Sequence, residues 1–153
     1  ALVHPRVIEA LYRASQAGVP VDLNVRGICC LVPGIPGVSE GIRVVSILGR
    51  YLEHSRIYAF EIGDETEVFI GSADLMPRNL DNRVELITPV NDPTAKAELL
   101  DTLERCLADN TSSWILQRDG AWDRVTPGPG EEPRNCQREL MARARALAAE
   151  SAS

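Results

Sequence analysis

The chain has 153 residues, of which 44% are hydrophobic, 25% charged and 5% aromatic, and 16 basic against 22 acidic residues leave a net charge of −6 with histidine neutral. This composition excludes a disordered chain, a collagen and a coiled coil, and the acidic balance argues against a general nucleic-acid-binding surface. The longest apolar run, residues 25–32, is interrupted by Arg26 and falls short of the roughly 20 residues of a membrane helix. We therefore predict a soluble globular chain with no transmembrane segment and no nucleic-acid partner.

Apolar residues recur at intervals of three and four over residues 5–17, between Pro5 and Gly18, and this pattern predicts an amphipathic helix. The next apolar run predicts a strand that begins at Val21 and continues to Val32, ahead of a loop rich in glycine and proline at residues 33–37. Four β-branched runs then predict further strands, at residues 42–48, 55–62, 67–70 and 84–90.

Asp92 and Pro93 form a typical helix start, and leucines on one stripe continue that predicted helix to Leu107. Residues 114–117 and 122–125 flank the dipeptide Asp119-Gly120 and predict a hairpin. A linker at residues 126–133 precedes a predicted surface helix at residues 137–149. The fold class that we expect is α/β, with a mixed sheet flanked by helices. Residues 1–91 would form the core, and residues 92–153 a helix, hairpin and helix extension packed on it or following it.

Four cysteines stand at positions 29, 30, 106 and 136 without any CxxC pair. We interpret them as reduced, small buried hydrophobes, and we expect no metal site in this chain. Basic charge is carried by 15 arginines and one lysine, which suits local recognition of phosphate because the guanidinium fork can bind two oxygens at once. Solvated surface charge is the alternative interpretation of these arginines.

Two segments carry candidate site residues. His54 and Arg56 lie two residues apart at the start of the predicted strand 55–62, hence on one face of it. Two cationic donors cannot hydrogen-bond to each other, so the pair of His54 and Arg56 suits a site in which an anion lies between them. The alternative is that His54 is a buried histidine of the core. Gly71 to Asp74 form a small-residue strand end at which backbone amides and the Ser72 hydroxyl can approach a ligand closely.

These two segments resemble the phospholipase D superfamily signature, HxKxxxxD and GSxN. His54 and Ser72 match it, whereas Arg56 replaces the lysine, Glu61 stands at the aspartate position and Asp74 replaces the asparagine. Longer strings, at residues 2–17, 25–31, 33–37, 49–58 and 72–81, resemble the C-terminal domain of bacterial polyphosphate kinase, and this resemblance extends from residue 2 to about residue 110.

The resemblance implies a phospholipase D-like fold and a part in the reversible transfer of the terminal phosphoryl group of ATP to inorganic polyphosphate. It also implies magnesium and a phosphohistidine on a preceding domain that this chain does not contain, so we expect the chain alone to be inactive. His54 would be the second histidine of the site, facing phosphate and assisting proton or charge transfer, and Arg26 would bind nucleotide and phosphate.

Four weaker candidates could line the same phosphate path, namely Arg56, Ser72, Asp74 and Arg78, and Arg83 could also lie along it. The alternative for Arg26 is an ion pair with Asp22 or Glu53. The alternative for Arg78 and Arg83 is surface pairing with Asp81 and Glu85.

By the same resemblance, the partners are ATP or ADP, polyphosphate and the upstream domains, in a homo-oligomeric cytoplasmic enzyme whose membrane association is left open. The magnesium ligands would lie upstream. Two other functions stay open: a phospholipase D-like phosphodiesterase or nuclease that dimerises to obtain a second HxK motif, and a noncatalytic module that binds a polyanion or docks a partner.

Overall fold

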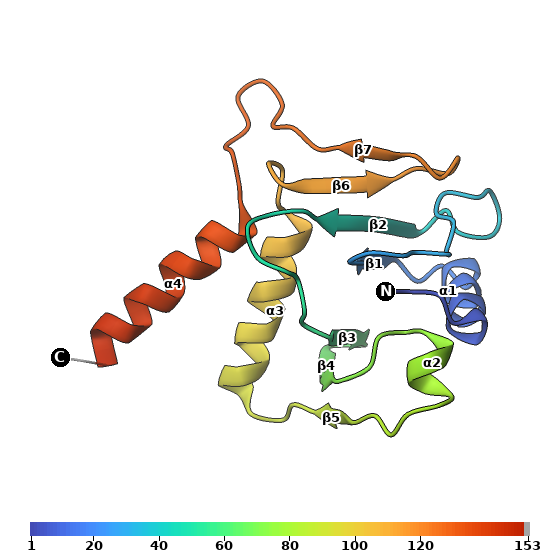
Figure 1. Cartoon of the computed structure of the whole chain (residues 1–153), viewed down its shortest axis with the longest axis horizontal. Coiled ribbons are helices and arrows are strands. Elements are labelled where there is room, and N and C mark those ends of the chain that lie inside the picture. Colours follow the sequence, from blue (N-terminus) through green and yellow to red (C-terminus); the bar gives the residue numbers. More distant parts are fainter. Residues whose placement is uncertain (152–153) are drawn as a thin grey trace.

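The computed structural model describes residues 1–151, in which helices precede, separate and follow groups of strands (Figure 1). Their order is α1 (Pro5–Gln16), β1 (Val21–Asn24), β2 (Ile42–Ile47), β3 (Ile57–Ile62), β4 (Glu65–Gly71), α2 (Pro77–Leu80), β5 (Ile87–Pro89), α3 (Pro93–Leu107), β6 (Ser113–Leu116), β7 (Trp122–Arg124) and α4 (Cys136–Ser151).

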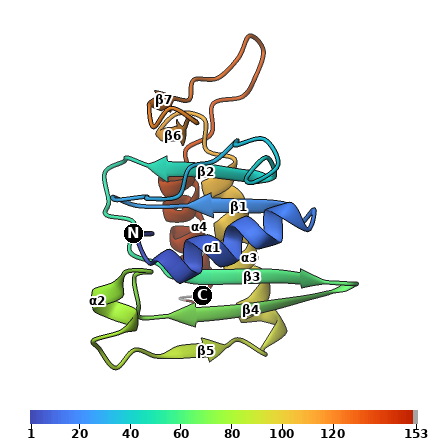
Figure 2. The ribbon, with the colours of Figure 1, turned by 90° about the vertical axis from the view of Figure 1, so that its right-hand side faces the viewer.

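The strands form two sheets that lie in one layer. A four-stranded sheet has the order β1-β2-β6-β7, with β1 and β2 parallel and the other pairs antiparallel, and β3-β4-β5 form an antiparallel sheet. Leu2 pairs with both Cys29 and Leu75, so the segment before α1 joins the two sheets. Figures 1 and 2 show α1 on one side of this layer and α3 and α4 on the other. The expected α/β class is confirmed, and its sheet is divided in two.

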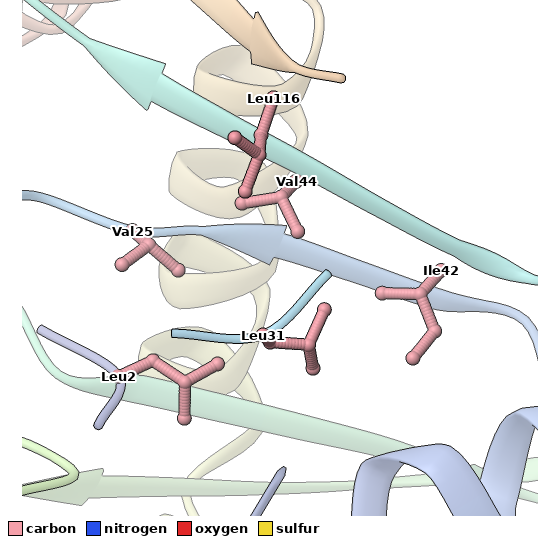
Figure 3. Packing of buried hydrophobic residues seen from close by; sticks show 6 residues of the cluster. All are labelled: Leu2, Val25, Leu31, Ile42, Val44 and Leu116. Atoms are coloured by element: carbon pink, nitrogen blue, oxygen red, sulfur yellow. The ribbon is translucent and has the colours of Figure 1, made fainter. Parts of the chain in front are cut away.

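The central strand β2 is buried on both faces. Ile42 and Val44 point toward α1 and join Leu2, Val25, Leu31 and Leu116 in one apolar cluster (Figure 3). Ile47 has the opposite parity and packs with Cys106 of α3 and Cys136 of α4. Because β6 pairs with β2, the hairpin packs on the core as a continuation of its sheet. Strand β2 is therefore held from both sides up to the point where it ends.

The predicted helix starts and the hairpin are confirmed. The Asp92 side chain accepts a hydrogen bond from the Ala95 backbone N–H at 2.8 Å and caps α3. Gly120 turns the chain between β6 and β7 with φ of +87°. All four cysteines are free, but only Cys106 and Cys136 are buried; Cys29 is half-buried and Cys30 is exposed, so the expectation of four buried thiols was wrong at these two positions.

The strand predicted from Val21 to Val32 ends at Asn24. Val25 still donates its N–H to Val45 at 2.8 Å, and Gly27 then turns the chain with φ of +80°. Among the apolar residues that follow, Leu31 is 1% exposed but Ile28 is 60% exposed, and none of them pairs in a strand beyond the bridge at Cys29. The prediction failed because an apolar run by itself shows neither that every residue in it is buried nor where strand pairing stops.

Asp109 is a buried carboxylate where α3, β6 and α4 meet. Its Oδ1 accepts from the backbone N–H groups of Thr111 (3.0 Å) and Ser112 (2.7 Å), and its Oδ2 accepts from the Ser112 hydroxyl (2.7 Å) and the Cys136 N–H (2.8 Å). Burial alone would raise the pKa of this carboxyl, but the hydrogen bonds from Ser112 and Cys136 outweigh burial and lower it. The carboxylate therefore holds the first residue of α4 to the end of α3.

Replacing Asp109 by asparagine is expected to destabilise the chain by about 2–4 kcal/mol at pH 7, since three backbone N–H groups and the Ser112 hydroxyl lose a charged acceptor. Because its folded pKa lies below the unfolded value of about 3.9, the stabilisation is complete above that value and is lost as the pH falls through the folded pKa. Urea unfolding of the 153-residue chain between pH 3 and 8 should show a difference from wild type that shrinks toward acid pH. The exposed Asp123 supplies the control D123N, and equal stabilities of the two variants would contradict this role.

Candidate functional site

Arg26 follows the carboxyl end of β1 and is partly buried. Within residues 1–151 its guanidinium makes no hydrogen bond and no ion pair. Both expected competitors are otherwise engaged: Asp22 accepts from Arg43 Nε at 2.6 Å, and Glu53 Oε1 accepts from Gln137 Nε2 at 2.6 Å. The ion-pair alternative for Arg26 was therefore wrong, and the guanidinium is available to an anion.

The loop of residues 48–56 follows the carboxyl end of β2 and carries His54. Strands β1 and β2 are parallel, with Asn24 opposite Val45, so Arg26 and this loop leave the sheet at the same edge. Figure 1 shows both arrowheads pointing the same way, with the chain after β2 descending to β3. Ligand sites in such sheets form outside the carboxyl ends of the strands.

His54 is exposed and contacts Arg56 within this loop. Arg56 Nη1 donates to the His54 carbonyl oxygen at 2.7 Å and lies 2.9 Å from Nδ1 and 3.1 Å from Nε2 of the ring. Similar distances to both ring nitrogens place the guanidinium against the ring, and a ring nitrogen can accept from it only in the neutral imidazole. Strand β3 begins at Ile57, so the loop and not strand alternation brings the two side chains together.

Asp74 orients Arg56 from the neighbouring segment. Its Oδ1 lies 3.1 Å from Arg56 Nη2, and both side chains are 14% exposed. The Gly71 N–H also donates to the Arg56 carbonyl at 3.0 Å, since Ile57 of β3 pairs with Ile70 of β4. The His54 and Gly71-to-Asp74 segments are thus adjacent, and the anion beside Arg56 is a carboxylate of the chain. A carboxylate repels phosphate, so Asp74 suits holding the guanidinium better than binding substrate.

The Ser72 hydroxyl is engaged within its own neighbourhood. It donates to Glu85 and accepts from the Leu86 N–H at 3.1 Å, and Asn79 Nδ2 also donates to Glu85 at 2.8 Å. The hydrogen bonds from Ser72 and Asn79 lower the pKa of Glu85. A phosphate could use this hydroxyl only by displacing Glu85.

Arg78 and Arg83 are exposed, Arg78 on α2 and Arg83 after it. Asp81, the expected partner of Arg78, lies 3.2 Å from His4 Nε2. Among residues 1–151 neither arginine forms an ion pair within 4 Å, so the expected surface pairing was wrong. In the structure Arg56 contacts both His54 and Asp74, and neither Arg78 nor Arg83 bonds to these three residues.

Gln137 is a residue near the site that sequence reasoning missed. It belongs to the first turn of α4, is 7% exposed and hydrogen-bonds to Tyr51 and Glu53 of the loop. It lies more than 80 residues from its partners in sequence, and no local pattern marks it.

No group of three or more His, Cys, Asp or Glu side chains that could hold a metal ion lies within residues 1–151. Over the same residues, no helix has the length and apolar character needed to cross a bilayer.

The sequence profile described as polyphosphate kinase C-terminal domain 2 matches residues 1–137. A polyphosphate kinase of Thermosynechococcus vestitus is 55% identical over 143 residues, which are 94% of this chain and 20% of that protein. One of Rhodopirellula baltica is 54% identical over 140 residues, 92% of this chain and 16% of that protein. This chain therefore spans only 16–20% of the length of these curated relatives.

The crystal structure of polyphosphate kinase from Porphyromonas gingivalis is similar with a TM-score of 0.90 and 44% identity, over 95% of this chain and 22% of that one. The similarity confirms the fold expected from the sequence. Since the profile and these relatives cover most of the residues, the chain belongs to the polyphosphate kinase C-terminal domain 2 family.

Proposed function

We propose that this chain is the phosphate-binding C-terminal part of an enzyme that reversibly transfers the terminal phosphoryl group of ATP to polyphosphate. The observation that carries the proposal is the partly buried Arg26, which has no partner within residues 1–151 and lies at the sheet edge where the His54 loop begins. The names of the relatives supply the reaction class.

The residues at this edge suit phosphoryl transfer, in which catalysis comes mainly from positioning and from cations around the transferred oxygens. Arg26 can offer a two-pronged contact to phosphate. Asp74 fixes Arg56, which contacts the exposed His54. We assign His54 to proton or charge transfer beside the phosphate, because imidazole can both donate and accept a proton near neutral pH. The nucleophile that becomes phosphorylated would be a histidine of the upstream part of the enzyme.

Mg²⁺ commonly accompanies nucleotides in such reactions, where it neutralises charge on the phosphates. Residues 1–151 contain no carboxylate cluster that fits a complete magnesium site. We therefore propose that its protein ligands lie upstream, and we assign no step of this chain to the metal. ATP or ADP, polyphosphate, the upstream domains and a second copy of the enzyme are the partners that we propose for a cytoplasmic enzyme.

The test uses the full-length enzyme that carries this chain. With ATP labelled in the terminal phosphate, we expect label in acid-insoluble polyphosphate, and with polyphosphate and ADP we expect ATP. The 153-residue chain alone should do neither. Metal-free cleavage of a phosphodiester by the purified protein, without phosphoryl transfer from ATP, would instead support the phosphodiesterase alternative and overturn the proposal.

A further inference from the structure

The side-chain amide of Gln137 hydrogen-bonds the His54 loop from α4. Nε2 donates to the Tyr51 carbonyl at 2.8 Å and to Glu53 Oε1 at 2.6 Å, and Oε1 accepts from the Tyr51 N–H at 3.0 Å. Both amide protons and one acceptor position are thus directed at residues 51 and 53. An amide that is 7% exposed and fully paired in this way keeps a fixed orientation.

Little else holds the backbone of this loop. Leu48 donates to the Ser112 carbonyl at 2.9 Å at one end, and Arg56 accepts from Gly71 at 3.0 Å at the other. Between these anchors, residues 49–55 make no backbone–backbone hydrogen bond within residues 1–151, and Gln137 is the one side chain from outside the loop that bonds to their backbone there. Around Tyr51 the path of the loop therefore depends on this amide, while at its far end Arg56 donates to the His54 carbonyl.

The loop also packs tightly on α4. A Cβ at Gly49 would lie 2.8 Å from Gln137 Cδ and 3.1 Å from Nε2, so a larger residue there would displace the amide. Two residues on, the Tyr51 hydroxyl donates to Met141 Sδ at 3.1 Å, one helical turn beyond Gln137. Residues 49–51 thus lie along the first two turns of the helix.

The helix that carries Gln137 is itself fixed to the core. Asp109 accepts from the N–H of Cys136, and Cys136 is buried against Ile47. Glu139 accepts from Arg105 Nη1 of α3 at 2.8 Å and from Arg134 Nη2 at 2.9 Å. Because α4 is fixed to the core, the hydrogen bonds of Gln137 hold the loop at a fixed position relative to the core.

We propose that Gln137 is a positioning residue that sets where His54 lies relative to Arg26; this inference rests on the proposed function. Arg26 follows β1, and within residues 1–151 it makes no hydrogen bond or ion pair with α4, so no such bond ties its position to the amide. Loss of the amide should therefore reduce turnover more than it weakens nucleotide binding.

The first test compares Q137L with Q16L in the full-length enzyme. Gln16 matches Gln137 chemically, since its Nε2 donates to the Gly37 carbonyl at 3.2 Å, but it lies at the end of α1. We expect Q137L to lower kcat by about 10- to 100-fold with the KM for ATP within about threefold, because displacement of reacting groups by about 1 Å can cost 10²-fold. Hydrogen exchange of the Tyr51 amide, which donates to Gln137 Oε1, should become faster in Q137L and stay unchanged in Q16L.

The second test introduces a negative charge at position 137. In Q137E the introduced carboxylate can still accept from Tyr51 but faces the carboxylate of Glu53, so kcat should fall at least as far as in Q137L. Acid pH protonates the introduced carboxyl and returns a donor, so the ratio of the Q137E to the wild-type kcat should rise as the pH falls from 8 to 6. The double variant E53Q/Q137E places an amide donor at position 53, opposite the introduced carboxylate. Its kcat should be about tenfold higher than that of Q137E.

These results distinguish a positioning role from a general loss of stability. A general loss of stability would predict neither recovery of activity in E53Q/Q137E nor faster hydrogen exchange that is confined to the loop. Wild-type turnover in Q137L, unchanged exchange of the Tyr51 amide, or additive losses in E53Q/Q137E would each overturn the inference. Absence of phosphoryl transfer in the wild-type enzyme would instead defeat the proposed function, and the exchange measurement would still report whether Gln137 holds the loop.

Discussion

Replacing Arg26 by alanine in the full-length enzyme should lower kcat/KM for ATP by about 10³-fold. The guanidinium is partly buried at the edge where β1 ends and has no hydrogen bond or ion pair within residues 1–151. Within residues 1–151 the substitution therefore breaks no hydrogen bond or ion pair of the fold, but it removes a cation that can make a two-pronged contact with phosphate. Initial rates of polyphosphate synthesis at varied ATP measure the effect.

Two further arginine variants make this test specific. R26K keeps the charge but cannot reproduce the fork, so it should restore only a small part of the lost activity. R43A removes an exposed ion pair with Asp22 from the neighbouring strand and should retain wild-type turnover. Full activity in R26A would remove Arg26 from the site, and an equal loss in R43A would show that loss of any arginine from these strands is damaging.

Replacing His54 by alanine should lower kcat by about 10²- to 10⁴-fold, the range expected for loss of a group that transfers protons. The ring is exposed and contacts Arg56, so thermal unfolding should be unchanged. H54N, which keeps a hydrogen-bonding amide without a titrating ring, should be as inactive as H54A if proton transfer is the role. Single-turnover transfer from labelled ATP measures the chemical step.

His4, the other histidine of the chain, supplies a control in which stability and not turnover should change. His4 is 7% exposed, and its Nε2 lies 3.2 Å from Asp81 Oδ1. H4N should therefore lower the stability of the fold while turnover at temperatures below unfolding is retained. Wild-type turnover in H54A would show that this imidazole serves neither proton nor charge transfer.

Local patterns predicted the elements whose signals lie within a few residues. The cap at Asp92, the turn at Asp119-Gly120 and the apolar stripe of α1 each predicted an element that the structure contains. The same reasoning extended β1 to Val32 and began β3 too early, because the alternation and burial of side chains do not show where backbone pairing stops. The glycine turn at Gly27 and the pairing of Leu2 with Cys29 decided that end.

Only the part of the candidate site that a local sequence pattern marks was predictable. The positions of His54, Arg56 and Ser72 could be proposed from a signature, since the family pattern is local in sequence. Whether Arg26 was already paired depended on where Asp22 and Glu53 find their partners, and those partners are Arg43 and Gln137.

By itself the amino-acid sequence determined the α/β class, the main helices and hairpin and the family, because propensity, caps and long matching strings are all properties of neighbouring residues. Tertiary structure alone decided that the strands form two sheets joined at Leu2, that Arg26 is left without a partner in the described chain, and that α4 holds the His54 loop. The contact between Gln137 and Tyr51 spans 86 residues, and such a contact forms only when the core has brought the two segments together.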